Sequence, residues 1–338
     1  MFWSSAIQSN FNEFKGQAKV LPLALLLLTL LMACKGTNTS VNEPEINKIL
    51  EKNTDKLAVL DQTNTKISVN AIPKRIVCLD TFCIDILNSI GLEPVALLAH
   101  DESVEQKYFQ EQGNSKFIRI GGSWYEPNLE DIAKVKPDLV IGSAGIHDGL
   151  RNSLKSIVPL YLMYPYHYTA LIKNVEKIGE LTERSQQAKA AAEKFRSKLA
   201  AYQAKSPNNQ TVILINGDGT NFYVQTKKAI ECSTLAEVAK CPWGESSQAE
   251  GPLSTYIQYS LEQIIKNDPD VIFMLIPNSK EQLEKHPLWR ELKAVKNKRV
   301  YEVEDPVIWN THGLRSLSLV LDEVMPKLYP EVFPEPLP

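Results

Sequence analysis

The stretch Ser185–Lys205, SQQAKAAAEKFRSKLAAYQAK, is the part of the chain on which its organisation depends. Its apolar residues recur at three- and four-residue steps, which places them on one stripe of an α-helix with charged and amide side chains opposite. They are Ala188, Ala191, Ala192, Phe195, Leu199 and Tyr202. Ser185 is suited to cap the N-terminus, and Pro207 ends the helix. We predict one amphipathic helix, about 30 Å long at about 1.5 Å per residue.

The segments before and after this helix resemble each other. Residues 128–141 read NLEDIAKVKPDLVI, and residues 260–273 read SLEQIIKNDPDVIF. In each copy a short helix, capped by Asn128 or Ser260, stops at a proline, and an apolar run typical of a strand covered on both faces follows. We interpret the chain as two similar α/β lobes joined by the long helix.

Further apolar runs alternate with helical segments in both lobes. Those of the first lobe are 75–79, 94–98, 117–120, 139–141 and 160–163, and those of the second are 211–215, 271–276 and 299–303. This alternation favours parallel sheets. We therefore expect an α/β fold with two Rossmann-like lobes, each with a central parallel sheet, joined by one long backbone helix. The expected boundaries are 55–168 for the N-terminal lobe, 169–208 for the connecting helices and 209–338 for the C-terminal lobe.

The N-terminal segment differs from the rest. Lys15 and Lys19 precede the apolar run Val20–Met32, which is short for a membrane span, and the sequence Leu31-Met-Ala-Cys34 ends it. This arrangement is similar to a bacterial lipoprotein signal, which implies that residues 1–33 are removed and that Cys34 carries lipid. Residues 34–54, rich in Thr, Asn, Ser and Glu, are expected to form a flexible tether. The alternative is an uncleaved anchor, and either arrangement leaves the body outside the cytoplasm.

Composition excludes some classes of protein. The 338 residues are 43% hydrophobic with a net charge of −3, which suits a globular protein of one or two domains and gives no sign of nucleic-acid binding. Cys78 with Cys83 and Cys232 with Cys241 is the simplest disulfide pairing for an exported chain, and four buried reduced thiols are the alternative. No cysteine and histidine spacing indicates structural zinc.

Several stretches together resemble the iron-siderophore, haem and cobalamin binding proteins of ABC importers, between about residues 57 and 332. They are PKRIVCLD at 73–80, GLEPV at 91–95, the block from 127 to 141, and WRELKAVKNKRVY at 289–301. The resemblance implies a ligand held in the cleft between two lobes. It also implies docking on a two-fold permease through one acidic residue in each lobe, and Glu130 and Glu262 match those positions. Their alternative role is to stabilise helix N-termini.

Ligands of open α/β sheets bind beyond the carboxyl ends of the strands. The loops at those positions give our candidate ligand contacts: Trp124, Tyr125, His147, Tyr166, Tyr223, Trp243, Trp309 and Arg315. Aromatic side chains suit a large, partly apolar ligand, although any one of them can instead close the edge of a core. Arg315 is preferred over Arg119 and Arg151 as a contact for an anionic ferric chelate. His147 or Tyr166 could ligate haem iron.

The leading hypothesis is a lipid-anchored, extracytoplasmic solute-binding protein that captures a ferric siderophore and delivers it to an ABC importer. We expect a monomer with no intrinsic cofactor, no directly bound metal and no enzymatic activity, since Gly-x-Ser-x-Gly, His-Glu-x-x-His, P-loop and Gly-x-Gly-x-x-Gly signatures are absent from the sequence. Haem and cobalamin are alternative ligands, and a sensory lipoprotein or an extracytoplasmic enzyme on the same fold are alternative functions. The hydroxamate, catecholate and citrate classes stay open.

Overall fold

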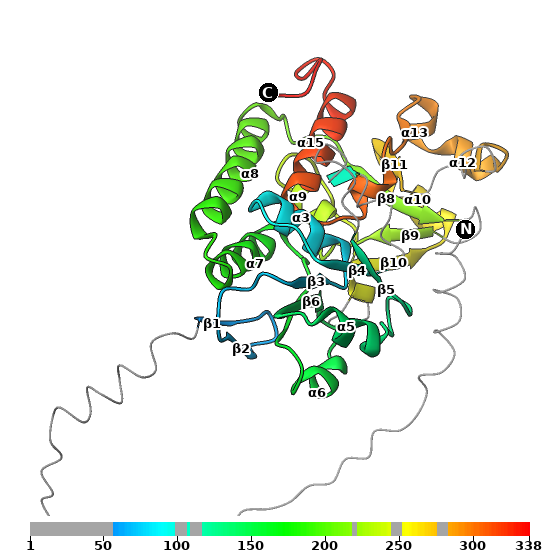
Figure 1. Ribbon diagram of the computed structural model, residues 1–338. Coiled ribbons are helices and arrows are strands. Elements are labelled where there is room, and N and C mark those ends of the chain that lie inside the picture. The colour runs from blue at the N-terminus through cyan, green and yellow to red at the C-terminus, as the bar shows by residue number, and fades with distance from the viewer. Residues whose placement is uncertain (1–56, 99–106, 109–116, 218–221, 245–251, 276–282) are drawn as a thin grey trace, which may run out of the picture. The chain divides into compact units, whose positions relative to one another are not determined.

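The computed structural model describes residues 57–98, 107–108, 117–217, 222–244, 252–275 and 283–338 (Figure 1). These residues belong to one compact unit, Lys52–Pro338. The expected signal segment, Cys34 and the whole tether lie outside the described residues. No helix within the described ranges has the length and apolar character needed to cross a membrane.

The N-terminal lobe is built on a five-stranded sheet in which every neighbouring pair is parallel. Its strands, in spatial order, are β5 (Ile118–Ile120), β4 (Ala96–Leu98), β3 (Ile76–Cys78), β6 (Leu139–Ser143) and β7 (Leu160–Met163). Successive residues of β3 face two different cores, since Ile76 and Cys78 pack in one cluster and Val77 in the other. The sheet is therefore covered on both faces, as its continuous apolar strands predict.

Short helices and a hairpin complete this lobe. The helices are α3 (Thr81–Ser89), α5 (Leu129–Val135) and α6 (Leu150–Leu154), and the hairpin pairs β1 (Leu57–Leu60) with β2 (Lys66–Val69) in antiparallel register. The carboxylate of Asp61 fixes the hairpin turn by accepting from the backbone N–H of Thr63 (2.9 Å) and Thr65 (3.1 Å). Arg151 donates to the same carboxylate and thereby ties the hairpin to α6.

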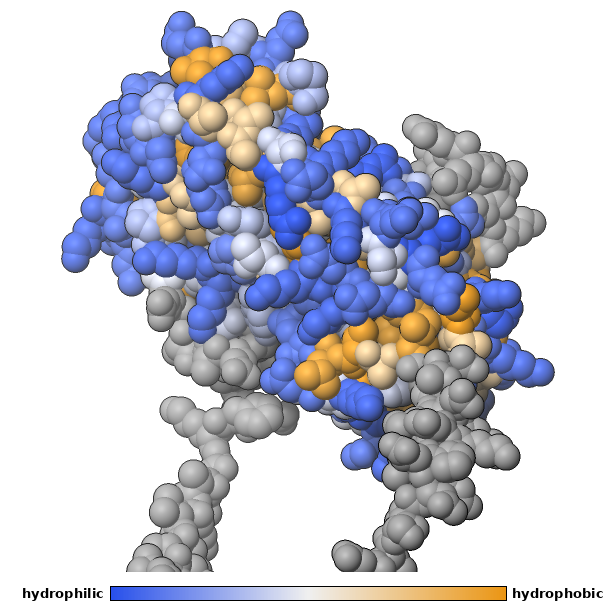
Figure 2. All heavy atoms as spheres, turned by 90° about the vertical axis from the view of Figure 1, so that its left-hand side faces the viewer, coloured by the Kyte–Doolittle hydropathy of each residue, from blue (hydrophilic) through white to orange (hydrophobic). Residues whose placement is uncertain are grey.

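Two helices connect the lobes, α7 (Tyr168–Leu181) and α8 (Ser185–Lys205), and they lie side by side in Figure 1. The bounds of α8 are those that its periodicity predicts, and its apolar stripe is buried apart from Ala191, which is half-buried. Arg184, rather than Ser185, occupies the N-cap position. The two helices approach closely at Gly179, because a Cβ there would lie 2.5 Å from the Cβ of Ala188. Figure 2 shows this side of the molecule, where hydrophilic side chains predominate.

The C-terminal lobe also has a five-stranded sheet, but this one is mixed. Its spatial order is β10 (Tyr256–Tyr259), β9 (Phe222–Gln225), β8 (Val212–Gly217), β11 (Val271–Met274) and β12 (Val300–Glu302). The strands β8, β11 and β12 are parallel, whereas β9 is antiparallel to both of its neighbours. The α/β fold with two sheets is confirmed, and the two antiparallel strands are an addition. Only residues 218–221 separate β8 from β9, which is too few for the crossover that a parallel pair requires.

The helices of this lobe are α9 (Ile230–Leu235), α10 (Leu261–Asn267), α12 (Pro287–Glu291), α13 (Lys293–Lys296), α14 (Pro306–Trp309) and α15 (Leu314–Leu328), with a 3₁₀ turn at Pro252–Thr255. The internal repeat is visible in α5 and α10. Asn128 caps α5 by accepting from the backbone N–H of Glu130, and Ser260 caps α10 through a reciprocal bond with Gln263. Each helix ends at a residue with positive φ directly before its proline.

Both predicted cysteine pairs are disulfides in the structure. The Cα–Cα distance is 5.6 Å for Cys78–Cys83 and 5.9 Å for Cys232–Cys241. The first pair joins the end of β3 to the first turn of α3, and the second ties α9 to the segment after it. The alternative of four reduced thiols is therefore not the one that the structure adopts.

Candidate functional site

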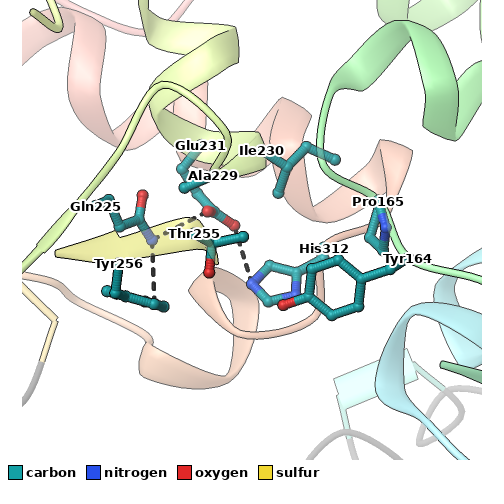
Figure 3. Close-up of a pocket in the computed structure, with 9 residues that line it drawn as sticks. All are labelled: Tyr164, Pro165, Gln225, Ala229, Ile230, Glu231, Thr255, Tyr256 and His312. Atoms are coloured by element: carbon teal, nitrogen blue, oxygen red, sulfur yellow. Dashed lines mark hydrogen bonds and ion pairs between the residues drawn. The ribbon is translucent and has the colours of Figure 1, made fainter. Parts of the chain in front are cut away.

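A pocket lies between the two lobes, with walls from five separate segments (Figure 3). Tyr164 and Pro165 follow β7 of the N-terminal lobe, and the other residues belong to the C-terminal lobe. These are Gln225, Ala229, Ile230, Glu231, Thr255, Tyr256 and His312. The space is partly open to solvent, and its empty volume, with the open solvent included, is about 220 Å³. In the N-terminal lobe it follows the carboxyl end of β7, where ligands of open α/β sheets bind, and in the C-terminal lobe it borders the antiparallel strands β9 and β10.

Glu231 is the centre of a polar network in this pocket. It is 2% exposed, and its carboxylate accepts from Gln225 Nε2 (3.0 Å) and lies 3.2 Å from His312 Nε2. Gln225 Nε2 also lies 3.3 Å from the Tyr256 hydroxyl. Burial raises the pKa of the Glu231 carboxyl, while His312 and Gln225 oppose that shift. The ring of Tyr164, from the other lobe, lies 6.5 Å from that of His312.

A second network fixes the loop of the N-terminal lobe that carries Trp124. Trp124 Nε1 donates to Asp80 Oδ2 (2.9 Å), and the Ser143 hydroxyl donates to the same oxygen. His147 Nδ1 accepts from the Ser143 backbone N–H (2.8 Å), and its Nε2 lies 2.7 Å from the Trp124 carbonyl oxygen. This pattern assigns the hydrogen of the neutral imidazole to Nε2. Burial lowers the pKa of His147, which keeps the ring in this neutral form.

His147 therefore has a different position from the one that we expected of a ligand contact. Its side chain is fully buried, and both ring nitrogens are occupied by the backbone of its own lobe. Gly142 lies against the ring, since a Cβ there would meet Nδ1 at 2.8 Å. The structure corrects the expectation: His147 positions Trp124 rather than reaching a ligand.

Two of the expected aromatic contacts are core residues. Trp243 and Trp309 are each 1% exposed. Trp243 Nε1 donates to the Val212 carbonyl, and Trp309 Nε1 donates to Glu323 Oε2 (2.8 Å). The expectation that these indoles line the cleft is wrong for this structure, because their rings close the core of the C-terminal lobe.

The remaining aromatic candidates keep accessible surface. Trp124, Tyr166 and Tyr223 are half-buried, and Tyr125 is 43% exposed with its ring 5.1 Å from that of Trp124. Tyr166 contacts the pocket residue Tyr164, with 4.8 Å between the ring centroids.

Arg315 lies at a contact between the lobes rather than among the pocket-lining residues. Its guanidinium carbon is 4.7 Å from the centre of the Tyr108 ring, and one nitrogen is 3.4 Å from Asn88 Oδ1. Arg151 donates to Asp61 of the hairpin, and Arg119 lies in the strand β5. The expectation that Arg315 faces the ligand therefore has no support from the pocket.

Asp85 joins the lobes, a role that no local pattern indicated. Its buried carboxylate accepts from the Tyr108 hydroxyl (2.6 Å) and from the backbone N–H of Arg315 (3.2 Å) and Ser316 (2.9 Å) in the first turn of α15. Gly313 makes room, since a Cβ there would lie 1.9 Å from Asp85 Cγ. Burial raises the pKa of the Asp85 carboxyl, and the bonds from Tyr108, Ser316 and Arg315 oppose it. Asp85 of α3 therefore provides an acceptor for two backbone N–H groups that the first turn of α15 leaves unpaired.

The pocket residues Gln225, Glu231 and Tyr256 were also missed. Gln225 is the last residue of β9 and Tyr256 is the first residue of β10, and neither antiparallel strand was predicted from the sequence. Glu231 lies in a short helix whose sequence pattern carries no functional signal. Tyr164 and His312 lie in loops rich in aromatic residues, which was the available signal. The described residues include no cluster of three or more His, Cys, Asp or Glu that could hold a metal ion.

Comparison with known proteins shows the family to which the chain belongs. A model of the periplasmic binding protein family matches residues 76–307. The chain belongs to this family. The family consists of non-enzymatic substrate-binding proteins.

Relatives of this periplasmic binding protein align along nearly its full length. The Fe(3+)-citrate-binding protein YfmC of Bacillus subtilis is 26% identical and covers 91% of this chain and 97% of its own. The putative ABC transporter substrate-binding lipoprotein YhfQ of Bacillus subtilis is 28% identical, over 90% of this chain and 95% of its own. The solved structure of the petrobactin-binding protein YclQ from Bacillus subtilis has a TM-score of 0.68 at 21% identity and covers 81% of this chain and 99% of that one. That likeness shows the two-lobed fold.

Proposed function

We propose that this chain is an extracytoplasmic, lipid-anchored protein that captures a ferric siderophore or a similar iron chelate between its lobes and delivers it to an ABC importer. The observation that carries the proposal is the pocket of Tyr164, Glu231, Tyr256 and His312, built from both lobes of a periplasmic binding protein. The relatives support the same class of ligand, since one is named for binding Fe(3+)-citrate.

The proposed contacts are the accessible aromatic and polar side chains at the facing edges of the lobes. They are Trp124, Tyr125, Tyr166 and Tyr223, together with the pocket residues Tyr164, Tyr256 and His312. Trp243, Trp309 and His147 are excluded by burial. The pocket is small, since most of the side chains that line it are themselves buried. A chelate would therefore place one part in the pocket and lie against the aromatic loops with the rest.

Membrane attachment through Cys34 is part of the proposal. It is supported by the Leu-Met-Ala-Cys sequence and by the relative YhfQ, which is named as a lipoprotein. Glu130 and Glu262 are proposed as the permease contacts. Both are exposed second residues of short capped helices, one in each lobe. A bond from Ser260 lowers the pKa of Glu262, so this carboxylate stays charged.

Tryptophan fluorescence tests the ligand class. The protein is titrated with ferric hydroxamate, catecholate and citrate chelates, with haem and with cyanocobalamin, and the signal is corrected for the absorption of each chromophore. We expect saturable quenching by one iron chelate, reduced in amplitude in a Trp124→Phe variant, because Trp243, Trp289 and Trp309 are buried in the core and Trp124 is the accessible indole among the described tryptophans. If the folded protein binds none of these ligands, or binds only cyanocobalamin, the iron-chelate proposal is wrong.

A further inference from the structure

The pocket contains a buried hydrogen-bond acceptor that has no partner. Gln225 is 2% exposed, and its Oε1 has no hydrogen-bond partner among the described residues. The orientation of this amide is fixed, since the Glu231 carboxylate is an acceptor and must face Gln225 Nε2. An unsatisfied buried acceptor is unfavourable, so the oxygen favours any ligand that brings a donor to it.

A second unpaired acceptor lies in the adjacent strand. Asn216 belongs to β8, which pairs with β9, the strand of Gln225. Asn216 Oδ1 is buried and is likewise without a partner in the described part of the chain, while the side chain of Asn216 hydrogen-bonds Tyr256. The side-chain amides of both residues therefore contact Tyr256, and both amide oxygens are buried without a partner in the described part of the chain.

The charged and aromatic groups of the pocket favour the same kind of ligand. Glu231 contributes a carboxylate, and the described residues that line the pocket include no lysine or arginine. His312 is the one basic side chain among these lining residues, and it reaches the carboxylate with a single nitrogen at 3.2 Å. Tyr164 and Tyr256 add aromatic rings, whose faces attract cations. Figure 3 shows Glu231 between Gln225 and His312, with the Tyr164 ring beside the imidazole.

From the unpaired Gln225 oxygen, the Glu231 carboxylate and the two tyrosine rings, we propose that the pocket binds the protonated amine of an iron chelate. The proposal rests on the proposed function and narrows it to chelates that carry an ammonium arm. The arm would donate to Glu231 and Gln225, both of which line the pocket. Polyanionic chelates such as ferric citrate would instead bring negative charge toward a buried carboxylate.

A pair of chelates that differ only at the amine tests this on the full chain in detergent. Ferrioxamine B is a ferric trihydroxamate with a free terminal amine, and its N-acetyl derivative has the same iron centre without the charge. Calorimetric titration should give a dissociation constant at least about tenfold lower for ferrioxamine B, as expected for a charge-assisted hydrogen bond. Equal constants for the two compounds, or tighter binding of ferric citrate than of either, would overturn the inference and leave the proposed function intact. If no ferric chelate binds the folded protein, both proposals fail together.

Substitution locates the effect. Glu231→Gln keeps the size of the side chain and removes its charge. In this variant the dissociation constants of ferrioxamine B and of its N-acetyl derivative should be about equal, and the constant of the N-acetyl derivative should not change. Glu291→Gln makes the same change at an exposed carboxylate outside the pocket and should retain the preference. If Glu231→Gln does not fold, Gln225→Met removes the unpaired oxygen and should reduce the preference. A preference that survives in a folded Glu231→Gln variant contradicts the assignment.

Discussion

Asp85 is the residue whose removal should affect the structure most directly, because it is one carboxylate with donors from both lobes. We expect Asp85→Ala to reduce the free energy of unfolding by about 1–3 kcal/mol, since it leaves buried N–H and hydroxyl groups without an acceptor. Urea denaturation measures this loss, and hydrogen exchange should become faster at the amides of Arg315 and Ser316. Glu93→Ala, at an exposed position of the same lobe, is the control and should change neither quantity. Unchanged exchange in α15 would contradict the role of Asp85.

His147 should make stability depend on pH. Its pKa is lowered in the folded protein from an ordinary value of 6.5, so the unfolded chain binds the proton more readily. The free energy of unfolding should therefore fall as the pH drops from about 6.5 toward the folded pKa, by about 1.4 kcal/mol for each pH unit between the two values. Urea midpoints at several pH values measure this. His147→Gln removes the titrating group, so the free energy of unfolding of this variant should depend less on pH. An identical pH profile for both proteins would show that another residue is responsible.

At the scale of elements, α5 and α10 are the clearest product of the internal repeat. Each has seven residues, a capped N-terminus and an exposed glutamate at its second position. Duplicated carboxylates would suit a two-fold partner, because charge at the rim of an interface steers encounter more than it stabilises the complex.

This arrangement gives a prediction for transport. Replacing both Glu130 and Glu262 with Gln should leave chelate affinity and thermal stability unchanged, since both side chains are exposed, while uptake of radioactive iron chelate by cells falls by at least about tenfold. A chain with Glu176→Gln and Glu193→Gln, which alters two carboxylates on the connecting helices, is the matched control. Normal uptake by the Glu130 and Glu262 variant would contradict the docking role and favour a purely local role at the helix N-termini.

At the scale of the whole molecule, the lobes are held together by more than one connection. The helix α8 packs against α7 and α15, and Lys198 of α8 pairs with Asp322 of α15 at 2.5 Å. Separate from α8, the Asp85 contact and the pair of Lys107 with Asp305 (2.5 Å) join the lobes directly. Such a set of contacts resists the hinge closure that flexible links allow.

We therefore expect little movement of the lobes when a ligand binds. Small-angle scattering of the protein with and without a bound chelate should give radii of gyration that agree within error. The Asp85→Ala variant is the useful comparison, because loss of one connection should make the ligand-free form more open. A clear decrease in the radius of gyration of the unmodified protein on ligand addition would show that the lobes move despite these contacts.

Local patterns predicted the elements but only part of the site. The helix α8, the capped helices α5 and α10 and the buried strands follow from periodicity, caps and prolines, each of which acts within a few residues. Trp124 and Tyr166 were predicted because they follow strand ends, and both keep accessible surface in the structure. Trp243 and Trp309 were misplaced for the same reason, since a strand-end position does not say whether an aromatic ring turns toward the cleft or into the core.

The two α/β lobes, the long connecting helix and the membership of the periplasmic binding proteins could be inferred from the sequence, because they depend on local spacing and on motifs along the chain. Contacts between residues far apart in the chain became visible only in the folded structure. The Asp85 bond to Ser316 spans 231 positions, and the pocket brings Tyr164 beside His312 from different lobes. Such contacts carry no local signal, since the chain must first close both lobes before burial and charge can act between them.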